Sequence, residues 1–191
     1  MNSKLASMIS AAAKYDSWVA FDCETTGFPP RGRLIELGAV HFNRDRQVIS
    51  EYHGLAKPPH RLPKMVSRLT GISDLDLMKS PTAHHLIHRF LQWLPADIPL
   101  IAHNINFDLH ILAIEVPGCN QWISHHPMLD SVQIARSLNQ FTDCRLATIA
   151  RSLDLSRTDL HRARADIYVV QELFLYALSK SRITGGSMPK T

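Results

Sequence analysis

The sequence predicts one α/β domain in which a mixed sheet carries helices on its faces. Three apolar segments rich in strand formers follow one another near the start, at residues 17–23, 33–42 and 47–55. The links between them are too short for a crossover helix, so we expect an antiparallel meander. Two shorter strands are expected at residues 99–102 and 128–129, each leading into a helical pattern. Together these segments make a mixed sheet flanked by helices.

Apolar residues at helical spacing account for most of the remaining chain. Residues 1–16 are expected to contain a short helix, and the sequence leaves open whether it packs on the domain or frays. A second short helix is expected at residues 64–69, because Gly71 is a typical C-terminal cap. Longer helical patterns cover residues 80–93, 106–114, 131–138, 146–153 and 163–181.

Size and composition indicate a single globular domain. The chain has 191 residues, of which 45% are apolar and 20% are charged, as in an ordinary protein with a full core. We expect a helical extension over residues 1–16, the main domain over 17–181 and a flexible tail over 182–191. No apolar run approaches the roughly 18 residues that a membrane span needs, and no signal-peptide core is present, so a cytoplasmic location is expected.

The net charge, the cysteines and the histidines do not by themselves identify a function. The formal net charge is +4 and the sequence pI is about 9.1, which is compatible with a phosphate-rich partner. The three cysteines are widely spaced and indicate neither a disulfide framework nor a zinc site. His84, His85 and His88 share one predicted helix, and the first and last have the spacing of a metal pair. No Glu-containing metalloprotease pattern surrounds them, so ordinary surface histidines are favoured.

Two carboxylates lie at the end of the first predicted strand. Asp22 and Glu24 are two residues apart, so they share one face of the strand, whereas Phe21 and Cys23 point the other way. Cys23 is then a small core residue. Two neighbouring charges at a buried strand end repel each other, and a divalent cation such as Mg²⁺ or Mn²⁺ removes that repulsion. The alternative is a strand that frays into solvent with two incidental acids.

A third acid suited to the same site is Asp108. It follows the short strand predicted at residues 99–102, at a strand-to-helix junction. Ligand sites of α/β sheets tend to lie at such junctions, and the helix dipole favours an acid in the first turn. The alternative is an acid that only stabilises its own helix.

The last predicted helix begins with a histidine and an acid. His161 and Asp166 are five residues apart, which places them about 140° apart on a regular helix. They share a site only if His161 lies on the loop before the helix while Asp166 faces the site from one of the first turns. The alternative is that His161 caps the helix and Asp166 pairs with Arg162.

Three motifs therefore occur in order. Their residues are Asp22 to Gly27, then His103, Asn104, Phe107 and Asp108, and then His161 and Asp166, with Thr70-Gly71-Ile72 and Asp130 between them. In this order and spacing the chain resembles the DEDDh 3′–5′ exonucleases, which include the proofreading epsilon subunit of bacterial replicative DNA polymerase. The resemblance runs from about residue 18 to residue 178. A sister branch has tyrosine four residues before the final Asp, where this chain has Arg162, so the histidine branch matches better.

The resemblance implies a ribonuclease H-like fold with a five-stranded mixed sheet, and a two-metal site. The implied ligands of two Mg²⁺ or Mn²⁺ ions are Asp22, Glu24, Asp108 and Asp166. One ion activates water and the other stabilises the leaving oxygen. His161 is the implied general base, because its reference pKa of about 6.5 suits proton transfer near neutral pH.

The resemblance also implies a pocket for the 3′-terminal nucleotide. Its expected residues are Thr25, Thr26, Gly27, Ile72, His103, Asn104 and Phe107. Phe107 or Ile72 is expected to pack against the base or the sugar. Several basic residues become candidates for phosphate contacts. These are Arg31, Arg33, Lys57, Arg61, Lys64, Arg68, Arg162 and Arg164.

The expected function is a metal-dependent 3′–5′ exonuclease that releases nucleoside 5′-monophosphates from single-stranded or frayed DNA ends. The first alternative is the same chemistry on RNA, which depends on whether the pocket accepts a 2′-hydroxyl. The second is a non-catalytic module that grips nucleic-acid ends or docks on a polymerase. The presence of all four acids and the histidine argues against the module. A stand-alone enzyme and a polymerase subunit are equally compatible with the sequence.

Overall fold

The sheet is five-stranded and mixed, as the sequence predicts. The computed structural model describes residues 3–155 and 162–185. The strands are β1 (Ser17–Thr25), β2 (Leu34–Asn43), β3 (Val48–Leu55), β4 (Leu100–Ala102) and β5 (Met128–Asp130), in the order β3-β2-β1-β4-β5. The first three strands pair antiparallel, which confirms the meander. β4 and β5 add in parallel beside β1.

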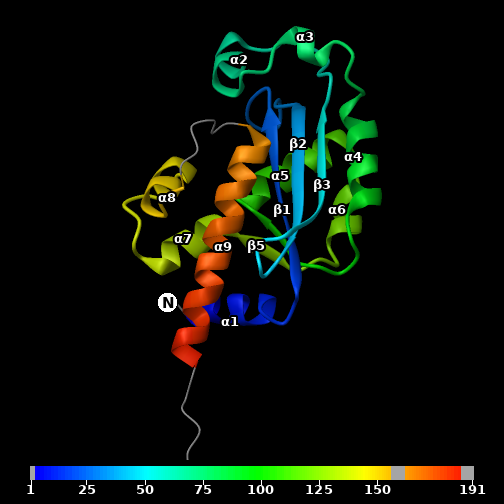
Figure 1. Ribbon diagram of the computed structural model, residues 1–191. Helices are drawn as coiled ribbons and strands as arrows, with labels where there is room; N and C mark the ends of the chain where they lie inside the picture. The colour runs from blue at the N-terminus through cyan, green and yellow to red at the C-terminus, as the bar shows by residue number, and fades with distance from the viewer. Residues whose placement is uncertain (1–2, 156–161, 186–191) are drawn as a thin grey trace, which may run out of the picture.

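Helices cover both faces of this sheet (Figure 1). On one face lie α1 (Ser3–Ala12), α7 (Ser131–Leu138), α8 (Leu146–Ser152) and α9 (Ala163–Gly185). On the other face lie α4 (Ala83–Trp93), α5 (Ile105–Glu115) and α6 (Cys119–Ile123). Two short helices, α2 (Lys64–Thr70) and α3 (Asp74–Leu77), sit beyond the end of the sheet where β1 ends. Among the helices of residues 3–155 and 162–185, none has the continuous apolar length that a membrane span requires.

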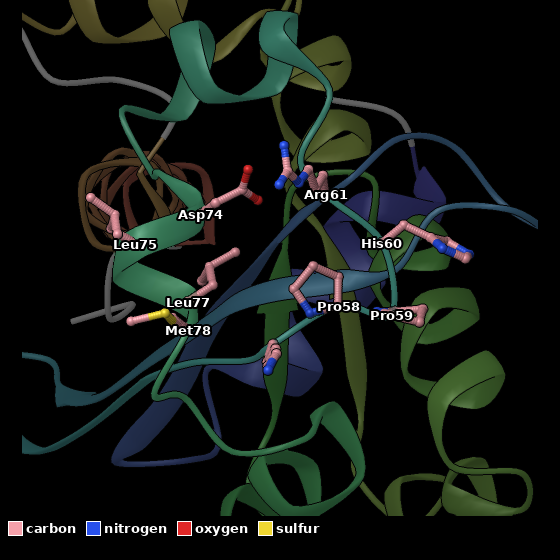
Figure 2. Close-up of a pocket in the computed structure, with 9 residues that line it drawn as sticks. Pro58, Pro59, His60, Arg61, Asp74, Leu75, Leu77 and Met78 are labelled. Atoms are coloured by element: carbon pink, nitrogen blue, oxygen red, sulfur yellow. The ribbon is translucent and has the colours of Figure 1, made fainter.

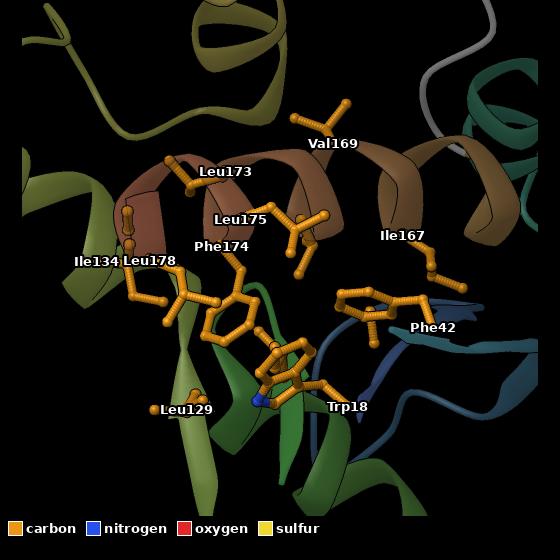
Figure 3. Packing of buried hydrophobic residues seen from close by; sticks show 14 of the residues in the cluster. Trp18, Phe42, Leu129, Ile134, Ile167, Val169, Leu173, Phe174, Leu175 and Leu178 are labelled. Carbon is orange, nitrogen blue, oxygen red and sulfur yellow. The ribbon is translucent and has the colours of Figure 1, made fainter. Parts of the chain in front are cut away.

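Side-chain alternation along β1 divides the core into two halves. Trp18 faces α9, where its ring meets Phe174 edge to face with 5.0 Å between centroids (Figure 3). Phe21 and Cys23 point to the opposite face and pack with α4 and α5. Because β1 is the central strand, both of its faces are buried, and Cys23 is the small core residue that the sequence predicts.

The N-terminal helix packs on the domain rather than fraying. Ile9 and Ala12 of α1 are buried in the same cluster as Trp18 and Phe174. The Trp18 indole donates a hydrogen bond of 3.1 Å to the carbonyl of Ala12, at the end of that helix. Burial of two apolar residues and this bond settle the question that the sequence leaves open for α1.

Two helix ends test the expected boundaries. Gly71 ends α2 with a φ of 71°, and its N–H donates to the carbonyl of Ser67, as expected for a left-handed C-terminal cap. The last helix, α9, runs to Gly185 and not to residue 181, so its expected end is four residues too early. Residues 186–191 of the expected tail lie outside the described residues.

A cavity of about 500 Å³ lies between the segment after β3 and helix α3 (Figure 2). Basic side chains and proline rings line one side, and the exposed Leu75 and Met78 of α3 line the other. The lining residues are Lys57, Pro58, Pro59, His60, Arg61, Asp74, Leu75, Leu77 and Met78. Asp74 is already engaged, because its Oδ1 accepts a hydrogen bond of 3.0 Å from the Leu62 N–H.

Candidate active site

Three acids from two distant elements meet at the end of β1. Asp22 and Glu24 follow Trp18 and Ala20 on the face that α9 covers, as their spacing predicts. Asp166 faces them from the start of α9 and is 8% exposed. One carboxylate oxygen from each of the three residues lies within 4.8 Å of the others. Oxygens this close are arranged as hard divalent cations require.

The fourth acid approaches the same strand end from the other side of the sheet. Asp108 is in the first turn of α5 and is 1% exposed. Its Oδ1 accepts a hydrogen bond of 3.0 Å from the backbone N–H of Cys23, the residue between Asp22 and Glu24. Its Oδ2 is buried and has no hydrogen-bond partner in the part of the chain that the structure describes. A buried oxygen without a partner is costly unless a proton or a cation occupies it.

The electrostatics of the cluster also fit a cation. Burial, reinforced by Asp108 and Asp166, raises the pKa of Asp22 well above its ordinary value. Burial and the neighbouring Asp166 raise the pKa of Glu24 to about 8. Burial likewise raises the pKa of Asp108 to about 8, against the opposing hydrogen bond from Cys23. With pKa values of about 8, Glu24 and Asp108 hold protons near neutral pH when no cation is bound. A divalent cation such as Mg²⁺ or Mn²⁺ would take the place of these protons, because it prefers carboxylate oxygens.

The stability of the metal-free protein is expected to fall as the pH rises from about 4 to about 8. The folded-state pKa values of Glu24 and Asp108 lie above their ordinary values, so the folded protein binds more protons than the unfolded chain in this window. Urea unfolding in EDTA should give a free energy of unfolding lower at pH 8 than at pH 5, by more than the roughly 1.4 kcal/mol of one pKa unit. Saturating Mg²⁺ should remove the decline. A flat or rising curve in EDTA would contradict the assignment of these pKa shifts.

The loop after β1 is held by its own threonines. The Thr25 hydroxyl donates to the carbonyl of Gly27 (2.8 Å), and the Thr26 hydroxyl accepts from the N–H of Arg33 (3.0 Å). Gly32 closes the loop so tightly that a Cβ there would lie 2.0 Å from the Gly27 carbonyl oxygen. These threonines therefore shape the loop beside the acids, and their contact with a nucleotide stays a prediction.

The second motif forms the turn between β4 and α5. Asp130 holds this turn, because its Oδ1 accepts hydrogen bonds from the N–H groups of Asn104 (3.0 Å) and Val132 (2.9 Å). His103 Nδ1 lies 2.8 Å from the Ser131 hydroxyl, and burial lowers the pKa of the imidazole. The turn leaves Asn104 exposed with a φ of 64°. Asp130 thus fixes the backbone of the turn that precedes Asp108.

The exposure of Ile72 and Phe28 changes the composition of the expected nucleotide pocket. Ile72 is 2% exposed and packs with Ile35 and Leu77, so its side chain offers no open surface for a base. Phe28, which lies outside the three sequence motifs, is 83% exposed, and its ring centroid lies 6.1 Å from that of Phe107, edge to face. Its signal in the sequence is an aromatic residue directly after the Thr-Thr-Gly turn.

Some of the basic residues hydrogen-bond within the protein, whereas others line the cavity beside α3. Arg162 donates to Glu36, Arg164 donates to Glu51, and Arg33 donates to two carbonyls of its own loop. These three arginines have partners within the protein, and their contact with phosphates stays a prediction. Lys57 and Arg61 instead line the cavity beside α3.

Two sequence candidates lie elsewhere. His161 is outside the described residues, so its expected place beside the acids stays a prediction. The rings of His84 and His88 are 4.4 Å apart on α4, which covers the face of the sheet opposite α9. This histidine pair is separate from the acid cluster.

Comparisons with known proteins agree with this geometry. The family model RNase_T, described as exonuclease, matches residues 19–174. A PolC-type DNA polymerase III of Thermotoga petrophila is 32% identical over 160 residues, 83% of this chain but only 12% of that protein. The DNA polymerase III subunit epsilon of Treponema pallidum is 31% identical over 173 residues, 87% of this chain and 78% of the subunit.

Solved structures show the same fold. Escherichia coli Exonuclease I in complex with a dT13 oligonucleotide has a TM-score of 0.73 at 17% identity, over 89% of this chain and 42% of that one. Exonuclease X in complex with 5′ overhanging duplex DNA has a TM-score of 0.65 at 19% identity, over 90% of this chain and 94% of that one. The chain belongs to the RNase T family of DEDD exonucleases and has their ribonuclease H-like fold.

Proposed function

We propose that this protein is a metal-dependent 3′–5′ exonuclease that releases nucleoside 5′-monophosphates from single-stranded or frayed DNA ends. The observation that carries the proposal is the meeting of Asp22, Glu24 and Asp166 within 4.8 Å. It is supported by Asp108, whose buried Oδ2 has no hydrogen-bond partner among the described residues and whose charge raises the pKa of Asp22. Relatives named as DNA polymerase III proteins support DNA as the substrate. A polymerase complex is accordingly a candidate partner.

The four acids and one histidine have separate roles. Asp22, Glu24, Asp108 and Asp166 hold two divalent cations, Mg²⁺ or Mn²⁺. Bound cations of this kind lower the pKa of water and stabilise negative charge on a phosphate. His161 takes the proton of the attacking water as general base. The hydrogen bond from the Asn104 N–H to Asp130 keeps the turn before Asp108 in place.

An unpaired 3′ end is the form of substrate that reaches this site. The acids are half-buried or buried at the end of β1, so a stacked duplex must first unstack its last nucleotides. Bases of single strands stack on aromatic side chains irrespective of sequence. Phe28 follows the Thr-Thr-Gly turn directly and Phe107 precedes Asp108 in the sequence, and their paired rings supply such a surface. The basic residues Lys57 and Arg61 at the cavity are suited to phosphates farther along the strand.

Phe28→Ala is expected to raise the KM for a single-stranded oligonucleotide with a smaller effect on kcat. Base–aromatic stacking is worth about 1–3 kcal/mol per base, and roughly 1.4 kcal/mol is a factor of ten. KM should therefore rise by about 5- to 150-fold in steady-state assays. The matched control is Trp122→Ala, because Trp122 is also an exposed aromatic residue (69%) but lies on α6. Equal KM values for the two variants would contradict the stacking role.

RNA is the second candidate substrate. A 3′-exonuclease solved in a study of histone mRNA stem-loop recognition shares the fold, with a TM-score of 0.72 at 15% identity. The deciding experiment mixes the protein with 5′-labelled DNA and RNA strands of one sequence, in Mg²⁺, Mn²⁺ or EDTA. We expect stepwise shortening of DNA from the 3′ end with either metal and none in EDTA. Faster shortening of RNA would favour the trimming enzyme, and binding without cleavage would favour the non-catalytic module.

A further inference from the structure

One buried carboxylate near the acid cluster has a different set of neighbours. Glu36 of β2 is 1% exposed and pairs in register with Glu24 of β1. Like charges directly opposite on neighbouring strands are destabilising, so the negative charge of Glu36 needs nearby hydrogen-bond donors or positive charges. His53 of β3 is one such donor, with its Nε2 2.7 Å from Glu36 Oε1.

The other donors come from the start of α9. The Arg162 Nε lies 3.2 Å from both Glu36 oxygens, and its Nη2 lies 2.9 Å from Oε1. The N–H of Ala163, the first residue of α9, donates to Oε2 over 3.3 Å. Burial alone would raise the pKa of Glu36, but these donors lower it to about 2. An ionised carboxylate at a helix N-terminus is also favoured by the helix dipole.

The backbone of β2 approaches α9 closely at the same point. Gly38 is two residues after Glu36, on the same face of the strand. A Cβ at Gly38 would lie 2.9 Å from Ile167 Cδ1 and 3.0 Å from Ala163 Cβ. The first turn of α9 is therefore held against β2 by close packing at Gly38 and by polar bonds at Glu36.

We propose that Glu36, with Arg162, is a positioning residue that seats the start of α9 so that Asp166 meets Asp22 and Glu24. Asp166 lies three residues after Ala163, so a shift of this turn would move its carboxylate out of the cluster. Glu36 is not itself a ligand, because both of its oxygens already accept hydrogen bonds from N–H donors. The consequence for catalysis rests on the proposed function, whereas the consequence for metal affinity does not.

The test compares two substitutions in the contact between Glu36 and Arg162 with a control substitution of another residue that bonds to Glu36. Glu36→Gln removes the charge, and Arg162→Lys keeps the charge but loses the planar fork that binds a carboxylate through two N–H groups. The control is His53→Gln, because His53 bonds to the same oxygen from β3 and not from α9. Calorimetry measures Mn²⁺ affinity without substrate, circular dichroism in urea checks folding, and oligonucleotide assays give kcat and KM.

Both contact variants are expected to lose about 10- to 100-fold in Mn²⁺ affinity and in kcat, the usual range for residues that orient metal ligands. KM and the urea midpoint of Arg162→Lys should stay close to wild type, and His53→Gln should keep wild-type metal affinity. If Glu36→Gln does not fold, Arg162→Lys decides. Because the two residues act through one contact, the double variant should lose no more Mn²⁺ affinity than the single variant with the larger loss.

Wild-type Mn²⁺ affinity in Arg162→Lys, or an equal loss in His53→Gln, would overturn the positioning role. Failure of the proposed function has a different signature. If the wild-type protein cleaves neither DNA nor RNA but Mn²⁺ affinity still falls in the two contact variants alone, the proposed function is wrong and the positioning role stands.

Discussion

Asp166→Asn is expected to lower exonuclease turnover by about 10³-fold or more while the protein stays folded. Metal ions contribute several kcal/mol of charge stabilisation to such reactions, and roughly 1.4 kcal/mol is a factor of ten in rate. Asparagine keeps the shape of the side chain but removes the negative charge of the proposed ligand that faces Asp22 and Glu24. The measurement is single-turnover cleavage of a 5′-labelled strand at saturating Mg²⁺.

The control for this substitution lies on the same helix. Glu172 of α9 pairs with Arg46 at 3.2 Å, away from the end of β1, so Glu172→Gln should cleave at nearly the wild-type rate. Unfolding in EDTA at about pH 8 adds an independent check. Asp166→Asn should be at least as stable as wild type there, because it removes a charge that repels Asp22 and Glu24. Turnover within tenfold of wild type would remove Asp166 from the site.

His161→Ala is expected to lower kcat by about 10²- to 10⁴-fold, the usual contribution of a general base. Mn²⁺ affinity should be unchanged, since the proposed ligands are the four acids and not His161. The wild-type pH–rate profile should rise with a pKa near the histidine reference value of about 6.5, and the variant should lose this rise. The matched control is His125→Ala, because His125 is an exposed histidine on the surface.

Calorimetry separates the two possible roles of His161. A variant that turns over slowly and binds Mn²⁺ normally has lost a base. A variant that binds Mn²⁺ more weakly has lost a ligand or the support of one, and the base would then have to be another group. Wild-type kcat in His161→Ala would contradict both roles.

The sheet could be predicted because its strands carry local signals. β1 and β2 are continuous apolar runs, and the turn between β2 and β3 is short and polar, so the pairing follows from chain connectivity. Helix α3 could not be predicted from periodicity, because it has only four residues. Its signal is a capping box, in which Ser73 and Asp76 bond to each other's backbone N–H.

The acids of the site could be predicted because each lies at the end of a recognisable element. The period of two in a strand places Asp22 beside Glu24, and the helix starts place Asp108 and Asp166. The role of Glu36 could not be found in this way, because it depends on the register that sets β2 beside β1 and on α9 lying across β2. Local patterns carry no information on such long-range contacts.

Anomalous diffraction from crystals grown with Mn²⁺ and a nucleoside 5′-monophosphate decides whether the four acids form a metal centre. We expect strong manganese peaks within coordination distance of carboxylate oxygens from Asp22, Glu24, Asp108 and Asp166. We also expect the phosphate of the nucleotide to contact these ions. Manganese bound elsewhere, or four empty carboxylates at saturating Mn²⁺, would contradict a metal-dependent nuclease centred on these acids.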